Sequence, residues 1–139
     1  PGCNMAFRKE VFSKHSFEEK LQRFGGYAQG EDTQLSRKLY EEKMKLFITK
    51  DGELLHLPAK GGRTKGKEFI AMSIYNRFLV WKTSIYPFHK ISVLSFTVRI
   101  FGRIILLYFI YLLQPKKKKY IAEGLKMGIK AIFDDFRYS

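Results

Sequence analysis

The chain has 139 residues, of which 26 are Lys or Arg and 13 are Asp or Glu, so its formal net charge is +13. Apolar residues make up 45% and aromatic residues 16% of the sequence, which is too much for a disordered tail. The single cysteine, Cys3, excludes an internal disulfide framework and a cysteine-rich zinc module. The excess of positive charge indicates a nucleic acid, an anionic membrane surface or a phosphorylated substrate as the partner.

Residues 1–60 have the pattern of a globular unit that contains both helix and strand. Leucines spaced one turn apart behind two acids predict a helix over about 31–43. Residues 45–49 predict a strand, Asp51-Gly52 a hairpin turn, and residues 53–57 the returning strand. The fold class expected from this order is α/β.

The middle of the chain, residues 61–90, begins as a loop and continues as a helix. Residues 60–67 are Lys, Arg, Gly and Thr only, which predicts a mobile basic loop. Residues 69–85 are dense in Phe, Ile, Tyr and Leu and predict a helix. The helix is expected to stop near Pro87, because proline cannot continue it.

The last third of the chain, residues 91–139, predicts membrane-associated helices. As a helix, residues 91–113 would be roughly 34 Å long, which is enough to cross a bilayer. Arg99 and Arg103 oppose a simple crossing, because each costs about 2.5 to 3.5 kcal/mol to insert. They share a helical face with serines, so we expect this helix to lie in the interface or dip into it. The cluster Lys116-Lys117-Lys118-Lys119 suits anionic headgroups, and an amphipathic helix is expected after it.

The sharpest chemical signal in the sequence is Gly30-Glu31-Asp32. In one interpretation Asp32 is an N-cap, since Asp is a favoured cap and the macrodipole stabilises acids at a helix start. In the other, Asp32 is a general base that takes a proton from an attacking hydroxyl. Gly30 would then let the substrate come close. The residues alone leave both interpretations open.

Short motifs follow one another in order along the first part of the chain. They are Gly2-Cys3-Asn4-Met5-Ala6-Phe7-Arg8-Lys9, Phe17-Glu18-Glu19, Gly30-Glu31-Asp32 with Leu35 and Arg37, and His56, with Tyr75-Asn76-Arg77 as a looser match. In this order they resemble the C-terminal half of a family 2 glycosyltransferase of the inverting GT-A type. The resemblance covers residues 1–60 and implies that the chain is the C-terminal piece of a longer one.

The resemblance implies a specific chemistry for Asp32. This carboxylate would deprotonate an acceptor hydroxyl as the oxygen attacks the anomeric carbon of a nucleotide-diphosphate sugar, which inverts the anomeric configuration. Glu31 would support acceptor binding or orient Asp32. The leaving diphosphate needs a cation, which in this family is Mg²⁺ or Mn²⁺ held by an upstream Asp-x-Asp motif. The sequence has no such motif, so the chain alone is expected to be incomplete and inactive.

Other residues have both a chemical and a plain interpretation. Asn4 would line the donor or acceptor pocket, or form a turn. Arg63 and Lys65 would contact phosphate oxygens from a flap over the diphosphate, or belong to a solvated linker. By resemblance His56 would help to bind the metal or the diphosphate, whereas a lone His at a strand end is usually a surface or packed residue.

Three functions are compatible with these features. The favoured one is a membrane-associated glycosyltransferase that acts on a glycan or lipid-linked acceptor in bacterial surface polysaccharide synthesis, by family analogy. A nucleic-acid-binding module is disfavoured, because no reader motif occurs and the charge lies beside hydrophobic segments. A basic membrane-surface module without catalysis is the other alternative. Lys and Arg flanking the apolar helix favour the cytoplasmic face of the plasma membrane.

Overall fold

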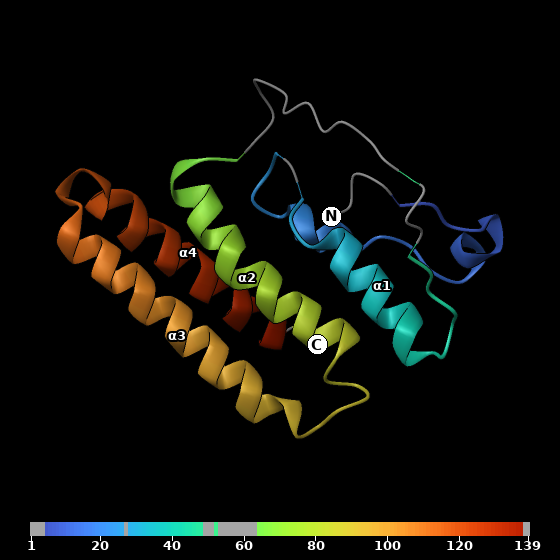
Figure 1. The fold of residues 1–139 in the computed structure, drawn as a ribbon. Helices are drawn as coiled ribbons and strands as arrows, with labels where there is room; N and C mark the ends of the chain where they lie inside the picture. Colours follow the sequence, from blue (N-terminus) through green and yellow to red (C-terminus); the bar gives the residue numbers. More distant parts are fainter. Residues whose placement is uncertain (1–4, 27, 49–51, 53–63, 138–139) are drawn as a thin grey trace.

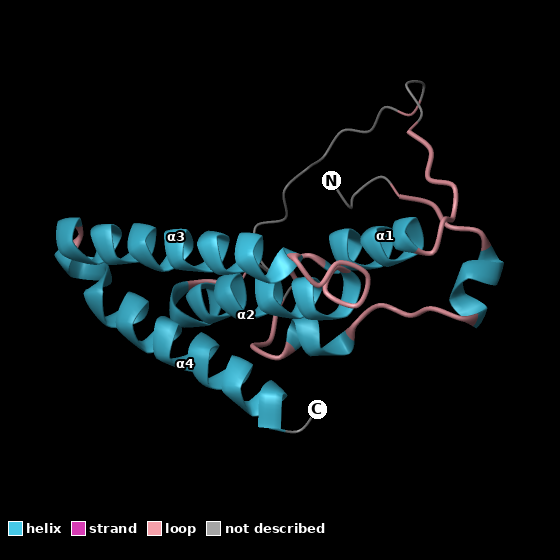
Figure 2. Ribbon diagram, turned by 90° about the horizontal axis from the view of Figure 1, so that it is seen from below, coloured by secondary structure: helices cyan, strands magenta, loops and turns pink. Residues whose placement is uncertain are grey.

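The computed structural model describes residues 5–26, 28–48, 52 and 64–137. Its α-helices are α1 (Glu31–Glu41), α2 (Gly66–Ser84), α3 (Ser92–Leu113) and α4 (Lys118–Arg137), and short 3-10 turns cover Lys9–Ser13, Glu19–Gln22 and Pro115–Lys117. Helices α1 and α3 lie on opposite sides of α2, while α4 packs along a further side of α2 and runs antiparallel to α3 (Figure 1, Figure 2).

The prediction of an α/β GT-A domain is wrong for the part of the chain that the structure describes. Helical segments make up 71% of those residues, and none of them is in a β-strand. The predicted strand over 45–49 is irregular as far as it is described, and Phe47 and Ile48 are 84% and 99% exposed. An apolar run of this kind forms a strand only when neighbouring strands bond its backbone and something covers one face. Residues 49–51 and 53–57 of the predicted hairpin lie outside the described residues.

Helix α1, which the sequence predicted, is bounded by two residues in the left-handed backbone region. Gly30 precedes it with a φ of 93°, a conformation that favours glycine. Glu31 and Asp32 occupy its first turn, where the macrodipole stabilises negative charge. After its last turn Lys43 has a φ of 64° and donates its N–H back to the helix, which ends it.

Helix α2 is the central element, because apolar side chains surround it and it contacts each of the other three α-helices. Its buried side chains form one cluster with a 3-10 turn and α4, and a second cluster with α3 and α4. The first cluster is Leu21, Tyr75, Phe78, Leu79 and Ala131, and the second is Ile74, Leu107 and Ile121. Burying these side chains fixes the three long helices relative to one another.

Two glycines let α4 approach α2 closely. A β-carbon at Gly124 would lie 2.5 Å from the β-carbon of Ile70 and 2.6 Å from the carbonyl oxygen of Lys67. One at Gly128 would lie 2.9 Å from the carbonyl oxygen of Ala71. These separations are far below van der Waals contact, so a larger residue at either position would force the two helices apart.

Helix α3 has three faces with different surroundings. The inner face packs on α2 and α4 through side chains such as Phe96, Ile100 and Leu107. A second face carries Arg99 and Arg103. The third face is apolar and exposed, and its members are Leu94, Val98, Phe101, Ile105, Tyr108, Phe109 and Leu112. By length and composition α3 is the only helix among the described residues that could cross a bilayer, and just 6% of its most apolar window is buried inside the molecule.

Candidate functional site

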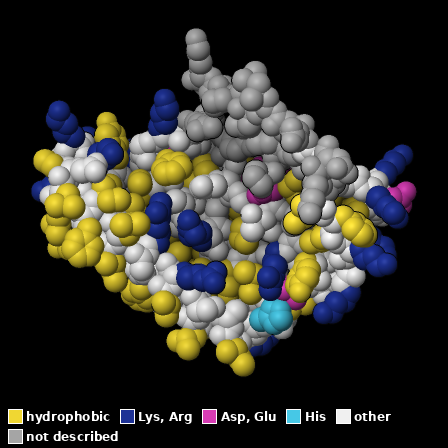
Figure 3. Space-filling view, in the orientation of Figure 1, with side chains coloured by type: hydrophobic (Ala, Val, Ile, Leu, Met, Phe, Trp, Pro, Cys, Tyr) yellow, Lys and Arg dark blue, Asp and Glu magenta, His cyan; other side chains and the backbone are white. Residues whose placement is uncertain are grey.

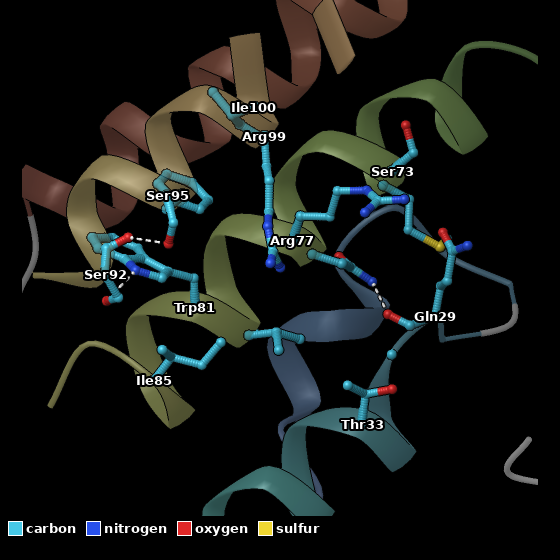
Figure 4. A pocket seen from close by; sticks show the side chains of 15 residues that line it. Gln29, Thr33, Ser73, Arg77, Trp81, Ile85, Ser92, Ser95, Arg99 and Ile100 are labelled. Atoms are coloured by element: carbon cyan, nitrogen blue, oxygen red, sulfur yellow. Dashed lines mark hydrogen bonds between the residues drawn. The ribbon is translucent and has the colours of Figure 1, made fainter. Parts of the chain in front are cut away.

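A cavity of about 380 Å³ opens where the start of α1 meets α2 and α3 (Figure 4). Its walls come from α2 and α3, and the segment just before α1 closes one end together with Thr33. The polar and charged side chains of the lining belong to Gln29, Thr33, Ser73, Asn76, Arg77, Ser92, Ser95 and Arg99. None of the described residues that line it is Asp or Glu, so its lining has a net positive charge.

Asn76 fixes the end of the cavity that is nearest to α1. Its side chain is buried, and Nδ2 donates to the carbonyl oxygens of Leu21 at 2.9 Å and Gln29 at 2.8 Å. Leaving such a buried group unpaired costs about 1 to 3 kcal/mol, so these bonds hold the segment before α1 against α2. Gly30 is thereby held close to α2, where a β-carbon would lie 3.6 Å from Cγ2 of Val80.

Trp81 sets the spacing of α2 and α3 at the other end of the cavity. Its ring stacks on Phe96 with 4.3 Å between ring centroids and 12° between ring planes. Its Nε1 donates to Oγ of Ser92 at 2.9 Å, as Figure 4 shows. The indole therefore packs on α3 through its face and bonds to α3 through its edge, which fixes the width of the cavity.

The positive charge of the cavity comes from two helices. Arg77 extends from α2 and Arg99 from α3, and both side chains point into the cavity (Figure 4). Arg103 follows Arg99 by one turn, and burial together with the nearby charge of Arg77 lowers the pKa of the Arg103 guanidinium. None of these three arginines has an ion pair or a hydrogen bond to another described residue.

The neighbouring arginines have a different environment. Arg23 lies 3.0 Å from Oδ2 of Asp134, and Arg37 pairs with Glu41. Figure 3 shows basic side chains gathered over the region between α2 and α3, with hydrophobic side chains along the α3 side of the same face. Arg77 and Arg99, which pair with no residue that the structure describes, point into the same cavity beside α3.

Asp32 and Glu31 lie in the first turn of α1, between two residues that line this cavity. Gly30 and Thr33 are among the lining residues, whereas the two carboxylates between them are not. Oδ1 of Asp32 accepts hydrogen bonds from the backbone N–H of Thr33 at 2.7 Å and from its hydroxyl at 3.2 Å. Because Gly30 occupies the N-cap position, Asp32 is a first-turn residue and not the N-cap.

The other residues predicted for the site are separated from it or not described. Lys65 is the exposed residue before α2 and does not line the cavity. Asn4, His56 and Arg63 lie outside the described residues. In the part of the chain that the structure describes, no three His, Cys, Asp or Glu side chains come together, so Glu31 and Asp32 alone do not form a site for Mg²⁺ or Mn²⁺.

Sequence reasoning did not predict that Arg77 and Arg99 would point into the same cavity. Arg77 entered it only as part of a loose motif, and Arg99 only as a cost of membrane insertion. The available signal was that each stands in a largely apolar stretch, residues 69–81 or 91–113, since an arginine in such a place usually faces a cavity or a partner.

Comparisons of this chain with protein-family models, with curated proteins and with solved structures found no match.

Proposed function

We propose that this chain is the membrane-associated, acceptor-binding part of an inverting glycosyltransferase, with Asp32 as the general base. The observation that carries the proposal is the meeting of three features at one cavity. The first turn of α1 carries Glu31 and Asp32 and contributes Thr33 to the lining. Arg77 and Arg99 point into the cavity, and α3, which forms one wall, carries an exposed apolar face.

The position of Asp32 suits a proton acceptor. The first turn of a helix stabilises a negative charge through the macrodipole and the free backbone N–H groups. The hydrogen bonds from Thr33 orient Oδ1 and leave Oδ2 available to an acceptor hydroxyl. In the proposed step the hydroxyl proton moves to Asp32, the hydroxyl oxygen bonds to the anomeric carbon, and the bond from that carbon to the nucleotide diphosphate breaks.

The surface of α3 suits attachment to a membrane. Leu94 and Val98 are 71% and 65% exposed on its outer face. Apolar surface of this extent is unfavourable in water, and burying it in lipid at the level of the headgroups removes the cost. The lysines at 116–119 follow directly and would meet anionic lipid at about 1 kcal/mol each. A lipid-linked acceptor would then reach the cavity from the membrane surface.

The test is Asp32→Asn in the whole gene product, with nucleotide-sugar turnover as the measurement. Removing a general base lowers the rate by about 10² to 10⁴-fold, and binding to vesicles should stay unchanged. Asp134→Asn is the matched control, because it removes the same charge from a carboxylate that pairs with Arg23 on another surface. Turnover that persists in Asp32→Asn would refute the base assignment.

A membrane-surface module without catalysis is the second candidate. It is favoured by one observation, which is that Asp32 bonds to its own neighbour Thr33 while neither acid lines the cavity. Under this function Asp32 stabilises α1 only, so Asp32→Asn would lower the free energy of unfolding and the whole gene product would have no nucleotide-sugar turnover to lose.

A further inference from the structure

We propose that Arg77 and Arg99 form a binding site for the phosphate group of a membrane lipid. The site extends the proposed function by naming a phosphate-bearing lipid as the class of acceptor. It rests on that function in one respect, which is that the lipid is called an acceptor. Binding of the phosphate itself requires no glycosyl transfer.

The first support is an imbalance of hydrogen-bond donors in the cavity. The hydroxyls of Ser73 and Ser95 already donate to the carbonyl oxygens of Ile70 and Ser92. The amide of Asn76 is likewise committed to two carbonyl oxygens. Among the remaining donors of the lining, the two guanidinium groups are the charged ones, and each has several N–H donors in a planar fork that matches the oxygens of a phosphate.

The second support is an imbalance of charge. Arg77, Arg99 and Arg103 come from facing helices and have no carboxylate partner among the described residues. Arg77 lies near enough to Arg103 that its charge adds to burial, the larger cause, in lowering the pKa of the Arg103 guanidinium. A dianion placed between Arg77 and Arg99 would neutralise this concentration of positive charge. The cavity of about 380 Å³ is large enough for such a group.

The third support decides between a lipid and a soluble phosphate. Arg99 is itself exposed, and the exposed side chains of Leu106 and Leu113 follow it at seven-residue intervals on the same side of α3. A phosphate held by Arg99 therefore lies at the boundary between the cavity and the surface that we assign to the bilayer. The hydrocarbon chain attached to that phosphate would run along Leu106 and Leu113, whereas a soluble phosphate would leave these exposed side chains uncovered.

The experiment measures binding to two sets of vesicles that have equal surface charge. One set contains phosphatidylcholine with phosphatidic acid, whose phosphate is exposed, and the other contains phosphatidylcholine with phosphatidylserine. We expect the chain to bind the first set about tenfold more tightly, the effect of one strong charge-assisted contact. The double variant Arg77→Gln/Arg99→Gln should lose this preference.

The matched control is Lys116→Gln/Lys117→Gln, which removes two positive charges from an exposed 3-10 turn outside the cavity. It should weaken binding to both sets of vesicles alike and keep the preference. Arg99→Lys keeps the charge without the planar fork and should retain only part of the preference. Circular dichroism checks that each variant is folded.

Two results would overturn the inference. One is a preference for phosphatidic acid that survives in the folded double variant. The other is that free glycerol 3-phosphate, without vesicles, binds the chain as tightly as phosphatidic acid in vesicles does. The ligand would then be a soluble phosphate. The Asp32→Asn variant should keep the lipid preference, so a failure of the base assignment and a failure of the phosphate site are separately visible.

Discussion

At the scale of single residues, Glu41 links the end of α1 to the loop between α2 and α3. Its Oε2 lies 2.9 Å from Nε2 of His89, it pairs with Arg37 one turn earlier, and its side chain is only 6% exposed. Burial by itself would raise the pKa of Glu41, but the hydrogen bond to His89 and the charge of Arg37 outweigh burial and lower the pKa.

This lowered pKa makes the stability contribution of Glu41 depend on pH. A carboxyl group whose pKa is lower in the folded state stabilises the fold above its unfolded pKa, and the contribution is lost as pH falls through the folded value. We expect Glu41→Gln to lower the free energy of unfolding at pH 7 and to have little effect at pH 3. Urea unfolding at both pH values measures this.

Glu10→Gln is the control for the Glu41 experiment, because Glu10 is exposed and its side chain has no ion pair to a described residue. It should leave the free energy of unfolding nearly unchanged at both pH values. A destabilisation by Glu41→Gln that is equally large at pH 3 would contradict the role given to the carboxylate charge.

At the scale of elements, the helices were predicted correctly, whereas the predicted strands do not occur in the part of the chain that the structure describes. Proline and glycine punctuation with helical spacing marks α1, α2 and α3 in the sequence, because these signals act between near neighbours along the chain. The strand prediction for 45–49 depended on partner strands that a local pattern cannot supply. Nor could the sequence pair α2 with α4, since that pairing depends on the space left open by Gly124 and Gly128.

Substitution of Gly124 by Ala tests the packing of α4 on α2. Alanine favours helix by up to about 1 kcal/mol over glycine, but its β-carbon would lie 2.5 Å from that of Ile70. We expect Gly124→Ala to destabilise the fold by about 1 to 3 kcal/mol, as overpacking does. Urea unfolding followed by circular dichroism gives the value.

Gly102 provides the matched control in α3, because nothing lies within 4 Å of the position of its β-carbon. There the helix preference acts alone, so Gly102→Ala should stabilise the fold by about 0.5 to 1 kcal/mol. Opposite signs for the two substitutions are expected. If both stabilised the fold, α4 would not be in close contact with α2.

At the scale of the whole molecule, the apolar face of α3 and the positive charge lie on adjoining surfaces. The chain carries a net charge of +13, and α3 is followed directly by a lysine cluster. A helix lying at the headgroup level would bury its outer face in lipid and keep Arg99 and Arg103 at the polar boundary. The candidate site forms only in this assembled molecule, because Arg77 and Arg99 lie on different helices and meet through the packing of α2 on α3.

Membrane attachment through α3 predicts the effect of adding charge to its outer face. Burial of a Val or Phe side chain contributes about 1.5 to 3 kcal/mol, so Val98→Glu/Phe101→Glu should weaken binding to anionic vesicles by at least about tenfold. Co-sedimentation with vesicles measures the loss. Gln22→Glu/Gln114→Glu adds the same charge at exposed polar positions and should have a much smaller effect. Equal losses in both variants would mean that charge alone holds the chain on the membrane.

The stacking of Trp81 on Phe96 has a spectroscopic consequence. The sequence contains one tryptophan, and it lines the cavity. All indole fluorescence of the native chain therefore originates at the wall of the cavity. Its emission wavelength and intensity report directly on whether water, an anion or an acyl chain occupies the space between α2 and α3.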